Sequence, residues 1–297
     1  MLQKYKNYKS KNLIFVICLG IFINTLGIIL SPQDYQKVEA QKSIQVRTNQ
    51  WLKVEKITGN VTYRNLYNYE NRAAKVGDRL QAASDEISTG ANGLALLSVD
   101  TGVGSIYVTE NTTIKIVSFR TAADNGRITN LSIPRGKARL QIRKFTNRGS
   151  QFNIQTPSGI SGVRGTSYYV SVKPNGNTVV TTFKGKVATT AQNQTKMVNG
   201  GFQNLTVVGQ PPSTAVPIIN DASLRYVIDR QASSSGRFIL FVGYTNPFNT
   251  VKVDELEQSL DESGKFSLRF PATSSLKVKV TVKTSTGKIQ IYEIPIL

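Results

Sequence analysis

The sequence predicts an all-β protein built from two β-rich domains. Short runs of β-branched and aromatic residues recur along the chain, and glycine, asparagine or aspartate separates most of them. No run of about 12 residues has the apolar spacing of an amphipathic helix. With 297 residues, 39% of them hydrophobic, the chain is long enough for one large or two ordinary cores. We therefore expect a β-sandwich or roll, followed by a small β-sandwich, after an N-terminal signal helix.

The N-terminal residues are typical of an export signal. Four lysines and no acidic residue precede an apolar run at residues 13–30, and Val38, Glu39 and Ala40 offer a cleavage site. We expect residues 1–40 to be a signal peptide that is removed after Ala40. The mature protein is then in the periplasm, in the cell envelope or outside the cell. The alternative is an uncleaved membrane anchor, because the apolar run approaches the roughly 20 residues that span a bilayer.

The first domain is expected to begin with a hairpin. Residues 51–64 alternate apolar and polar side chains around Gly59 and Asn60. The polar residues 66–75 predict a loop or a short helix. Further strands are expected at residues 94–99, 104–108, 113–119, 127–133, 137–142 and 151–155.

The most informative stretch is residues 155–172. Its glycines allow backbone conformations or close approaches that a Cβ would block, and its second half has the β-branched and aromatic content of a half-buried strand. Asn175 and Gly176 then mark a turn. The pattern predicts a tight bend that leads into a meander of three short strands, at residues 166–172, 178–183 and 187–190.

This combination resembles the FecR domain, whose pattern is a Gly-x-Arg-Gly-Thr-x-aromatic-x-Val strand and a later Gly-x-Val. The residues that hold these positions here are Gly162, Arg164, Gly165, Thr166, Tyr168, Val170, Gly185 and Val187. The resemblance covers roughly residues 80–205. Within the family, this stretch is similar to the exported proteins of cyanobacteria. It implies a periplasmic part of a signalling system. In the best-known members that domain contacts an outer-membrane receptor and controls a sigma factor.

The N-terminus departs from that arrangement. The twelve residues before the apolar run are too few for a sigma-binding cytoplasmic domain. We therefore expect an envelope adaptor, scaffold or binding module rather than a complete transmembrane signalling protein.

A proline-rich window at residues 209–217 predicts a domain boundary. We expect a FecR-like domain at residues 43–212, a linker at 213–222 and a second domain at 223–297. The strands expected in the second domain are at residues 238–243, 250–253, 265–270, 276–282 and 288–294. Their order is similar to that of the immunoglobulin-like modules of bacterial surface proteins, which implies a small β-sandwich.

The composition excludes several kinds of chemistry. The chain has no histidine, and its one cysteine, Cys18, lies in the expected signal peptide. This removes Ser-His-Asp triads, Cys/His pairs and structural zinc sites. The acids Asp78, Asp85, Glu86 and Asp100 are scattered and form no pair with the spacing of facing carboxylates. We expect no catalytic residues, no metal and no cofactor.

The formal net charge of +19 favours anionic partners. Residues 137–143 alternate apolar and polar side chains, so that Arg139 and Arg143 share a cationic strand face. A solvated face is the simplest interpretation. The functional alternative is a docking strip for an anionic glycan, a wall polymer such as peptidoglycan, a phospholipid head group or an acidic envelope protein. Export and the lack of a recognition motif argue against nucleic acid. Contact with a membrane is expected only through an uncleaved signal segment.

Three more residues are binding candidates. Arg164 lies between two glycines, where its guanidinium can bond backbone carbonyls across the bend or bind a carboxylate. Tyr168 and Tyr169 must point to opposite faces of one strand, so one of them is expected to be exposed and able to stack on a sugar ring. The acidic residues 254–262 form a solvated loop or complement a neighbouring basic strip.

Three functions follow from these observations. The first is an exported, non-enzymatic FecR-like protein of the cell envelope that acts in protein interaction, sensing or scaffolding. The alternative is a binding module for anionic polysaccharide or peptidoglycan. An envelope hydrolase is disfavoured, because no catalytic constellation is visible.

Overall fold

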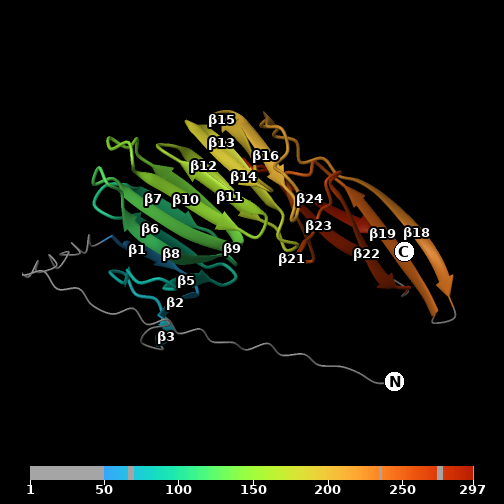
Figure 1. Cartoon of the computed structure of the whole chain (residues 1–297). Helices are drawn as coiled ribbons and strands as arrows, with labels where there is room; N and C mark the ends of the chain where they lie inside the picture. Colours follow the sequence, from blue (N-terminus) through green and yellow to red (C-terminus); the bar gives the residue numbers. More distant parts are fainter. Residues whose placement is uncertain (1–49, 66–69, 234–235, 273–276, 297) are drawn as a thin grey trace, which may run out of the picture. The chain divides into compact units, whose positions relative to one another are not determined.

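The computed structural model describes residues 50–65, 70–233, 236–272 and 277–296. Every regular element in these residues is a β-strand, which confirms the predicted all-β class (Figure 1). The described residues belong to one compact unit. The expected signal peptide, residues 1–40, lies outside them. No helix within the described part of the chain is long and apolar enough to span a membrane.

Two sheets that share one hydrophobic core make up the first β-sandwich, which we define as β1 to β17. Its strands are β1 (Leu52–Thr58), β2 (Val61–Asn65), β3 (Glu70–Ala73), β4 (Arg79–Leu80), β5 (Glu86–Thr89), β6 (Leu94–Val99), β7 (Gly104–Val108), β8 (Thr113–Thr121), β9 (Arg127–Ile142), β10 (Gln151–Thr156), β11 (Gly159–Val163), β12 (Ser167–Val172), β13 (Thr178–Lys184), β14 (Lys186–Ala191), β15 (Gln194–Asn199), β16 (Phe202–Thr206) and β17 (Val216–Pro217).

Strand β9 belongs to both sheets. Its first half pairs with β8 and, in parallel, with β10. Its second half pairs with β7 and β12 (Figure 1). We call the sheet β1-β6-β7-β9-β12-β13-β16 the upper sheet and the sheet β3-β2-β5-β8-β9-β10-β11-β14-β15 the lower sheet.

The bend between the two halves of β9 is at Gly136, which has a φ of +89°. A Cβ there would lie 2.5 Å from the Cα of Thr112, so only glycine fits. The hydroxyl of Thr112 accepts a hydrogen bond from the amide of Lys137 at 2.8 Å. The two separate strands expected at residues 127–133 and 137–142 are therefore one strand. Pro134 and Gly136 mark a change of sheet, not a loop.

Two predicted strand pairings are also wrong, because the chain changes from one sheet to the other at these places as well. Strands β1 and β2 do not form a hairpin, because β1 pairs with β4 and β6 whereas β2 pairs with β3 and β5. Strand β14 does not continue the meander of β12 and β13, because it pairs with β11 and β15 in the lower sheet. In both places a glycine with positive φ, Gly59 or Gly185, takes the chain from one sheet to the other.

Two local expectations are also corrected. The residues expected to form a tight bend before β12 include strand β11, which pairs with β10. The loop or short helix expected at residues 66–75 includes strand β3.

The C-terminal β-sandwich, which we define as β18 to β24, has its own core. One sheet has three strands and the other has four. The expected strands are all present, and β18 and β21 complete the sheets. The bounds are β18 (Arg225–Ser233), β19 (Gly236–Tyr244), β20 (Thr250–Val253), β21 (Leu256–Gln258), β22 (Lys265–Pro271), β23 (Lys277–Lys283) and β24 (Ile289–Pro295). Part of the expected linker, β17, pairs with β16 and so extends the upper sheet.

Gly165→Val tests the crossing that precedes β12. Gly165 has a φ of +130°, and a Cβ there would lie 2.6 Å from the backbone Cα of Lys144. Strain and crowding together are expected to cost about 3 kcal/mol or more. In thermal unfolding, Tm should fall by about 2–4 °C for each kcal/mol. Gly201→Val is the matched control, because Gly201 has a φ of +85° but nothing within 4 Å of a Cβ. Equal losses of Tm for the two variants would contradict the packing argument.

Candidate functional site

The FecR-like motif forms two adjoining sheet crossings. Gly165 and Thr166 lead from β11 to β12, and Gly185 leads from β13 to β14. A Cβ on Gly185 would lie 2.6 Å from the carbonyl oxygen of Gly165. The hydroxyl of Thr166 donates to the carbonyl of Lys186 at 3.0 Å. The glycines and the threonine of the motif therefore hold the two crossings against each other.

A basic hollow of about 760 Å³ opens beside these crossings. Gly165, Thr166 and Gly185 line it together with three cations, Arg143, Lys144 and Lys184. No acidic side chain lines the hollow. The three cations are exposed, and none of them forms an ion pair within the described residues. We call this site the basic hollow. Unpaired cations without a competing carboxylate are suited to an anionic group.

A row of aromatic and basic side chains lies on the outer face of the upper sheet. Arg139 of β9 lies between Tyr107 of β7 and Tyr169 of β12 in the strand register. Tyr107 is 44% exposed. The Tyr169 ring contacts two cations, with its centroid 4.5 Å from Lys137 Nζ and 5.9 Å from the Arg139 guanidinium. The inward residues of this half of β9 are buried, as the alternation predicted.

The two remaining binding candidates have structural surroundings. Arg164 donates from Nη2 to the backbone carbonyl of Asn147 at 3.0 Å, which ties the crossing to the loop after β9. Tyr168 is fully buried, and burial raises the pKa of its hydroxyl above the usual range. Its position in the core removes Tyr168 from any ligand-binding surface, and of the two tyrosines only Tyr169 reaches the outer face.

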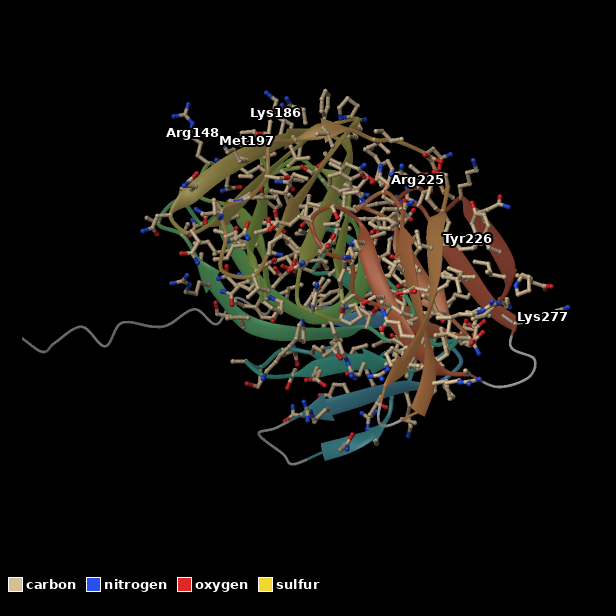
Figure 2. The ribbon with its side chains drawn as sticks, turned by 90° about the vertical axis from the view of Figure 1, so that its right-hand side faces the viewer. Arg148, Lys186, Met197, Arg225, Tyr226 and Lys277 are labelled. Carbon is tan, nitrogen blue, oxygen red and sulfur yellow. The ribbon has the colours of Figure 1, made fainter. Side chains whose placement is uncertain are left out.

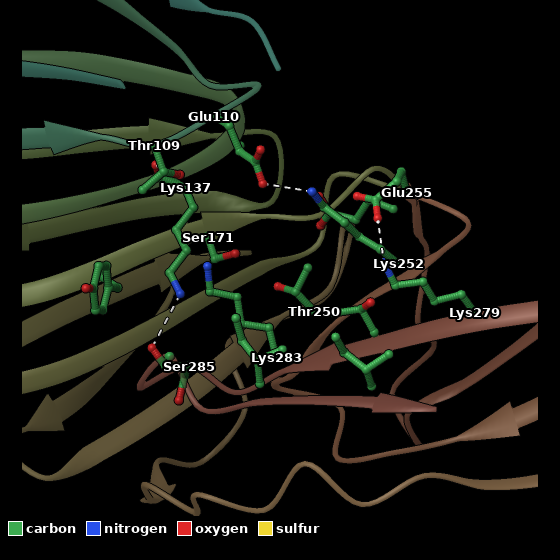
Figure 3. A pocket seen from close by; sticks show the side chains of 17 residues that line it. Thr109, Glu110, Lys137, Ser171, Thr250, Lys252, Glu255, Lys279, Lys283 and Ser285 are labelled. Carbon is green, nitrogen blue, oxygen red and sulfur yellow. Dashed lines mark hydrogen bonds and ion pairs between the residues drawn. The ribbon is translucent and has the colours of Figure 1, made fainter. Parts of the chain in front are cut away.

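A second site, which we call the interdomain cleft, lies between the two β-sandwiches and has a volume of about 530 Å³ (Figure 3). Two ion pairs line it, and the first of them joins its two sides. Lys252 of β20 lies 2.8 Å from the carboxylate of Glu110 in the first β-sandwich, and this hydrogen bond holds the pKa of Glu110 below its usual range. Lys279 of β23 lies 3.6 Å from Glu255.

Lys137 lies deep in the interdomain cleft. Its ammonium donates to the carbonyl of Ser285 at 3.4 Å (Figure 3). Burial, and then the like charge of Lys283, lower the pKa of Lys137 to about 8, while Glu257 opposes the shift. Glu257 is exposed as a residue, but burial of its carboxyl group raises its pKa, and Lys252 opposes this shift.

Lys173 is buried between the two β-sandwiches and is only 3% exposed. Its ammonium donates to the carbonyl of Pro247, and the neighbouring Asn175 amide donates to the carbonyl of Leu260 at 3.2 Å. Burial lowers the pKa of Lys173 to about 8. The turn between β12 and β13 is thus anchored to the C-terminal β-sandwich by polar bonds.

Sequence reasoning missed the lysines that line this cleft. Lys252 and Lys279 alternate with buried valines in their strands. The sequence shows this alternation, but a strand face that is simply exposed to solvent has the same pattern. The acidic residues 254–262 were expected to be solvated or to complement a basic strip. Glu257 of that cluster has electrostatic contact with Lys137 of the same chain.

The scattered acids have structural partners. The Asp78 carboxylate accepts hydrogen bonds from Arg72, and Glu86 accepts one from Arg64 at 2.6 Å. Asp85 accepts bonds from two backbone amides, and Asp100 is paired with Arg127. Among the described residues, no three Asp, Glu, His or Cys side chains are grouped so that they could hold a metal ion.

A model of the FecR protein family matches residues 85–188. Two crystal structures of a candidate anti-sigma factor from Parabacteroides distasonis ATCC 8503, at 1.65 and 2.50 Å resolution, are similar to this chain at 14% and 15% identity. The similarity covers 50% of this chain and 68% and 70% of those chains, with a TM-score of 0.36 in both cases. None of the curated proteins matches this sequence.

The family match confirms the predicted resemblance over residues 85–188, which carry a FecR domain. Every residue that lines the basic hollow lies within the matched stretch. Strands β1 to β4, β15, β16 and β17 lie outside it and complete the two sheets.

Lys173→Met tests the buried charge between the β-sandwiches. Burial lowers the pKa of Lys173 from its ordinary value of 10.5 to about 8 on folding, so both the folded and the unfolded chain bind the proton below pH 8. Between pH 8 and 10.5 the unfolded state binds more protons, so the stability of the wild-type protein rises with pH. Its free energy of unfolding relative to Lys173→Met should therefore rise by on the order of 3 kcal/mol across this interval. Urea unfolding at several pH values measures this, and a constant difference would contradict it.

Proposed function

We propose that this protein is a non-enzymatic sensing or adaptor protein of the cell envelope, and that its FecR domain binds an anionic partner at the basic hollow. The observation that carries the proposal is the position of three unpaired cations around the motif residues Gly165, Thr166 and Gly185. The two glycines allow close backbone packing, and Thr166 donates its hydroxyl to a backbone carbonyl, so these residues hold the crossings together. Their role is then to shape a binding surface.

The charge distribution supports an acidic protein as this partner. Arg148, in the loop after β9, and Lys186, directly after Gly185, project from the first β-sandwich (Figure 2). They add to the positive potential on the FecR domain. Such a potential accelerates encounter with an acidic surface, and unpaired side chains such as Arg143 are free to form ion pairs in the complex. Docking of this kind fits the signalling role that the FecR family implies.

A specific observation favours an anionic polysaccharide as the second candidate. The cross-strand row of Tyr107, Arg139 and Tyr169 places a cation between two aromatic rings on the outer face of the upper sheet. Aromatic faces stack on sugar rings, and a guanidinium binds carboxylates. The row is solvent-accessible at Tyr107 and runs across three strands, which suits a chain polymer.

The triple variant Arg143→Gln/Lys144→Gln/Lys184→Gln tests the basic hollow. Its binding to acidic envelope proteins, captured by crosslinking in extracts of the native host, is expected to fall about tenfold or more, because charge-assisted bonds are lost. The matched control is Arg225→Gln/Arg230→Gln/Lys277→Gln, which removes three exposed charges from the C-terminal β-sandwich. Figure 2 labels Arg225 and Lys277.

Equal loss of binding in both variants would show that net charge alone is responsible and would overturn the assignment of the hollow. If the polysaccharide candidate is correct, wild-type protein binds polygalacturonate, and Tyr107→Ala with Arg139→Gln weakens that binding while the triple variant at the hollow does not. Binding that does not change between about 50 and 300 mM salt would exclude an electrostatic mode in either case.

Cell fractionation tests the proposed location. The protein is expected in a periplasmic or envelope fraction of its native host, with Gln41 at its N-terminus by mass spectrometry and N-terminal sequencing. An intact N-terminus in the inner membrane would indicate the anchored form. Recovery of the protein from the cytoplasmic fraction would contradict the proposed function.

A further inference from the structure

Four lysines line the interdomain cleft, and two of them form no ion pair with any residue that the structure describes. Lys252 is paired with Glu110 and Lys279 with Glu255. Lys137 and Lys283 have no ion pair at 4 Å or less within the described residues. Their side chains extend into the cleft from its two sides, Lys137 from β9 and Lys283 from the end of β23 (Figure 3). The charge of Lys283 reaches Lys137, since it contributes to the lowered pKa of that group.

Like charges held together in a confined space favour an anion between them. Glu257 is the remaining carboxylate on the wall of the cleft, so one carboxylate outside the ion pairs faces two unpaired lysines. The ammonium of Lys137 has three N–H donors, and the structure uses one, in a long bond of 3.4 Å to Ser285. Lys137 therefore has donors available for a ligand.

Neutral donors line the cleft together with the two ammonium groups. The hydroxyls of Ser171, Thr250 and Thr281 line the same cleft, and none of them has a hydrogen-bond partner in the described part of the chain. Two ammonium groups and three hydroxyls offer more donors than the two oxygens of a carboxylate can accept. A tetrahedral phosphate presents more acceptor oxygens and carries about 1.5 to 2 negative charges at neutral pH.

We propose that the interdomain cleft is a binding site for a phosphate group, free or on a small solute, with Lys137 and Lys283 as its cationic ligands. Its volume of about 530 Å³ accommodates a solute of the size of a sugar phosphate. The Tyr169 ring, on the wall beside Lys137, offers an apolar surface to the remainder of such a solute. This site is distinct from the basic hollow, and the proposal is independent of the proposed function.

A phosphate bound there bridges the two β-sandwiches. Their cores are separate, and polar bonds join them, among them the bonds of Lys173 to Pro247 and of Ser285 to Gln203 at 2.8 Å. Polar interfaces within a chain permit relative motion more readily than apolar ones. An anion that neutralises one lysine from each side therefore adds a link between the β-sandwiches.

Calorimetric titration of the full chain tests the site. The probes are inorganic phosphate and glucose 1-phosphate, with glucose as the uncharged control. Wild-type protein is expected to bind the two phosphates and not glucose. Lys283→Gln should weaken that binding about tenfold or more, because a charge-assisted bond is lost. Lys137→Gln should do the same. Lys277→Gln is the matched control, since Lys277 is exposed on the same strand but does not line the cleft.

Each outcome of the titration supports or overturns the site. Tighter binding of glucose 1-phosphate than of phosphate supports the site and identifies a sugar phosphate, whereas equal affinities support the site with the phosphate group alone as ligand. No binding of either probe at about 10 mM, or an equal loss in Lys283→Gln and Lys277→Gln, overturns the proposal. Lys283→Gln changes an exposed side chain, so it is expected to keep the wild-type Tm, which is measured alongside. The triple variant at the basic hollow should bind phosphate normally, so the two sites can fail separately.

Discussion

The first β-sandwich depends on one backbone constraint, which is that β9 supplies hydrogen bonds to both sheets. A strand in the middle of a sheet must have partners on both edges, because a buried amide or carbonyl without one is costly. β9 meets this requirement twice, with β8 and β10 before its bend and with β7 and β12 after it. The bend requires Gly136, since a Cβ there would collide with Thr112. Its inward side chains then contribute to one core shared by both sheets.

The same constraint places the two sites at opposite ends of the second half of β9. Lys137 follows the bend and enters the interdomain cleft, whereas Arg143 follows the last residue of the strand and lines the basic hollow. The cations at the two ends differ in their surroundings. Those of the hollow face no carboxylate, while two of those in the cleft are paired with Glu110 and Glu255. The net charge attracts anions from a distance, but the unpaired lysines and arginines determine where an anion is held.

Local patterns predicted most strands of this fold but not all of their partners. The alternation in β6, β7 and β12 is visible because one face of each strand is buried. The partners of β2 and β14 were mispredicted, because a glycine with positive φ can reverse a chain within a sheet or take it to the facing sheet. Of the site, the cationic face of β9 and the role of Arg164 at a backbone carbonyl were accessible. The burial of Tyr168 was not, since the sequence shows only that Tyr168 and Tyr169 face opposite sides.

The sequence by itself determined the all-β class, the FecR-like motif and the absence of histidine chemistry. These depend on residue types and on spacings of a few positions, which local sterics and composition decide. Only the tertiary structure decided that Gly165 and Gly185 lie against each other and that Lys137 shares a cleft with Lys283. Such contacts join residues far apart in the chain. They depend on which sheet each strand enters and on the packing of two separate cores, which no local pattern encodes.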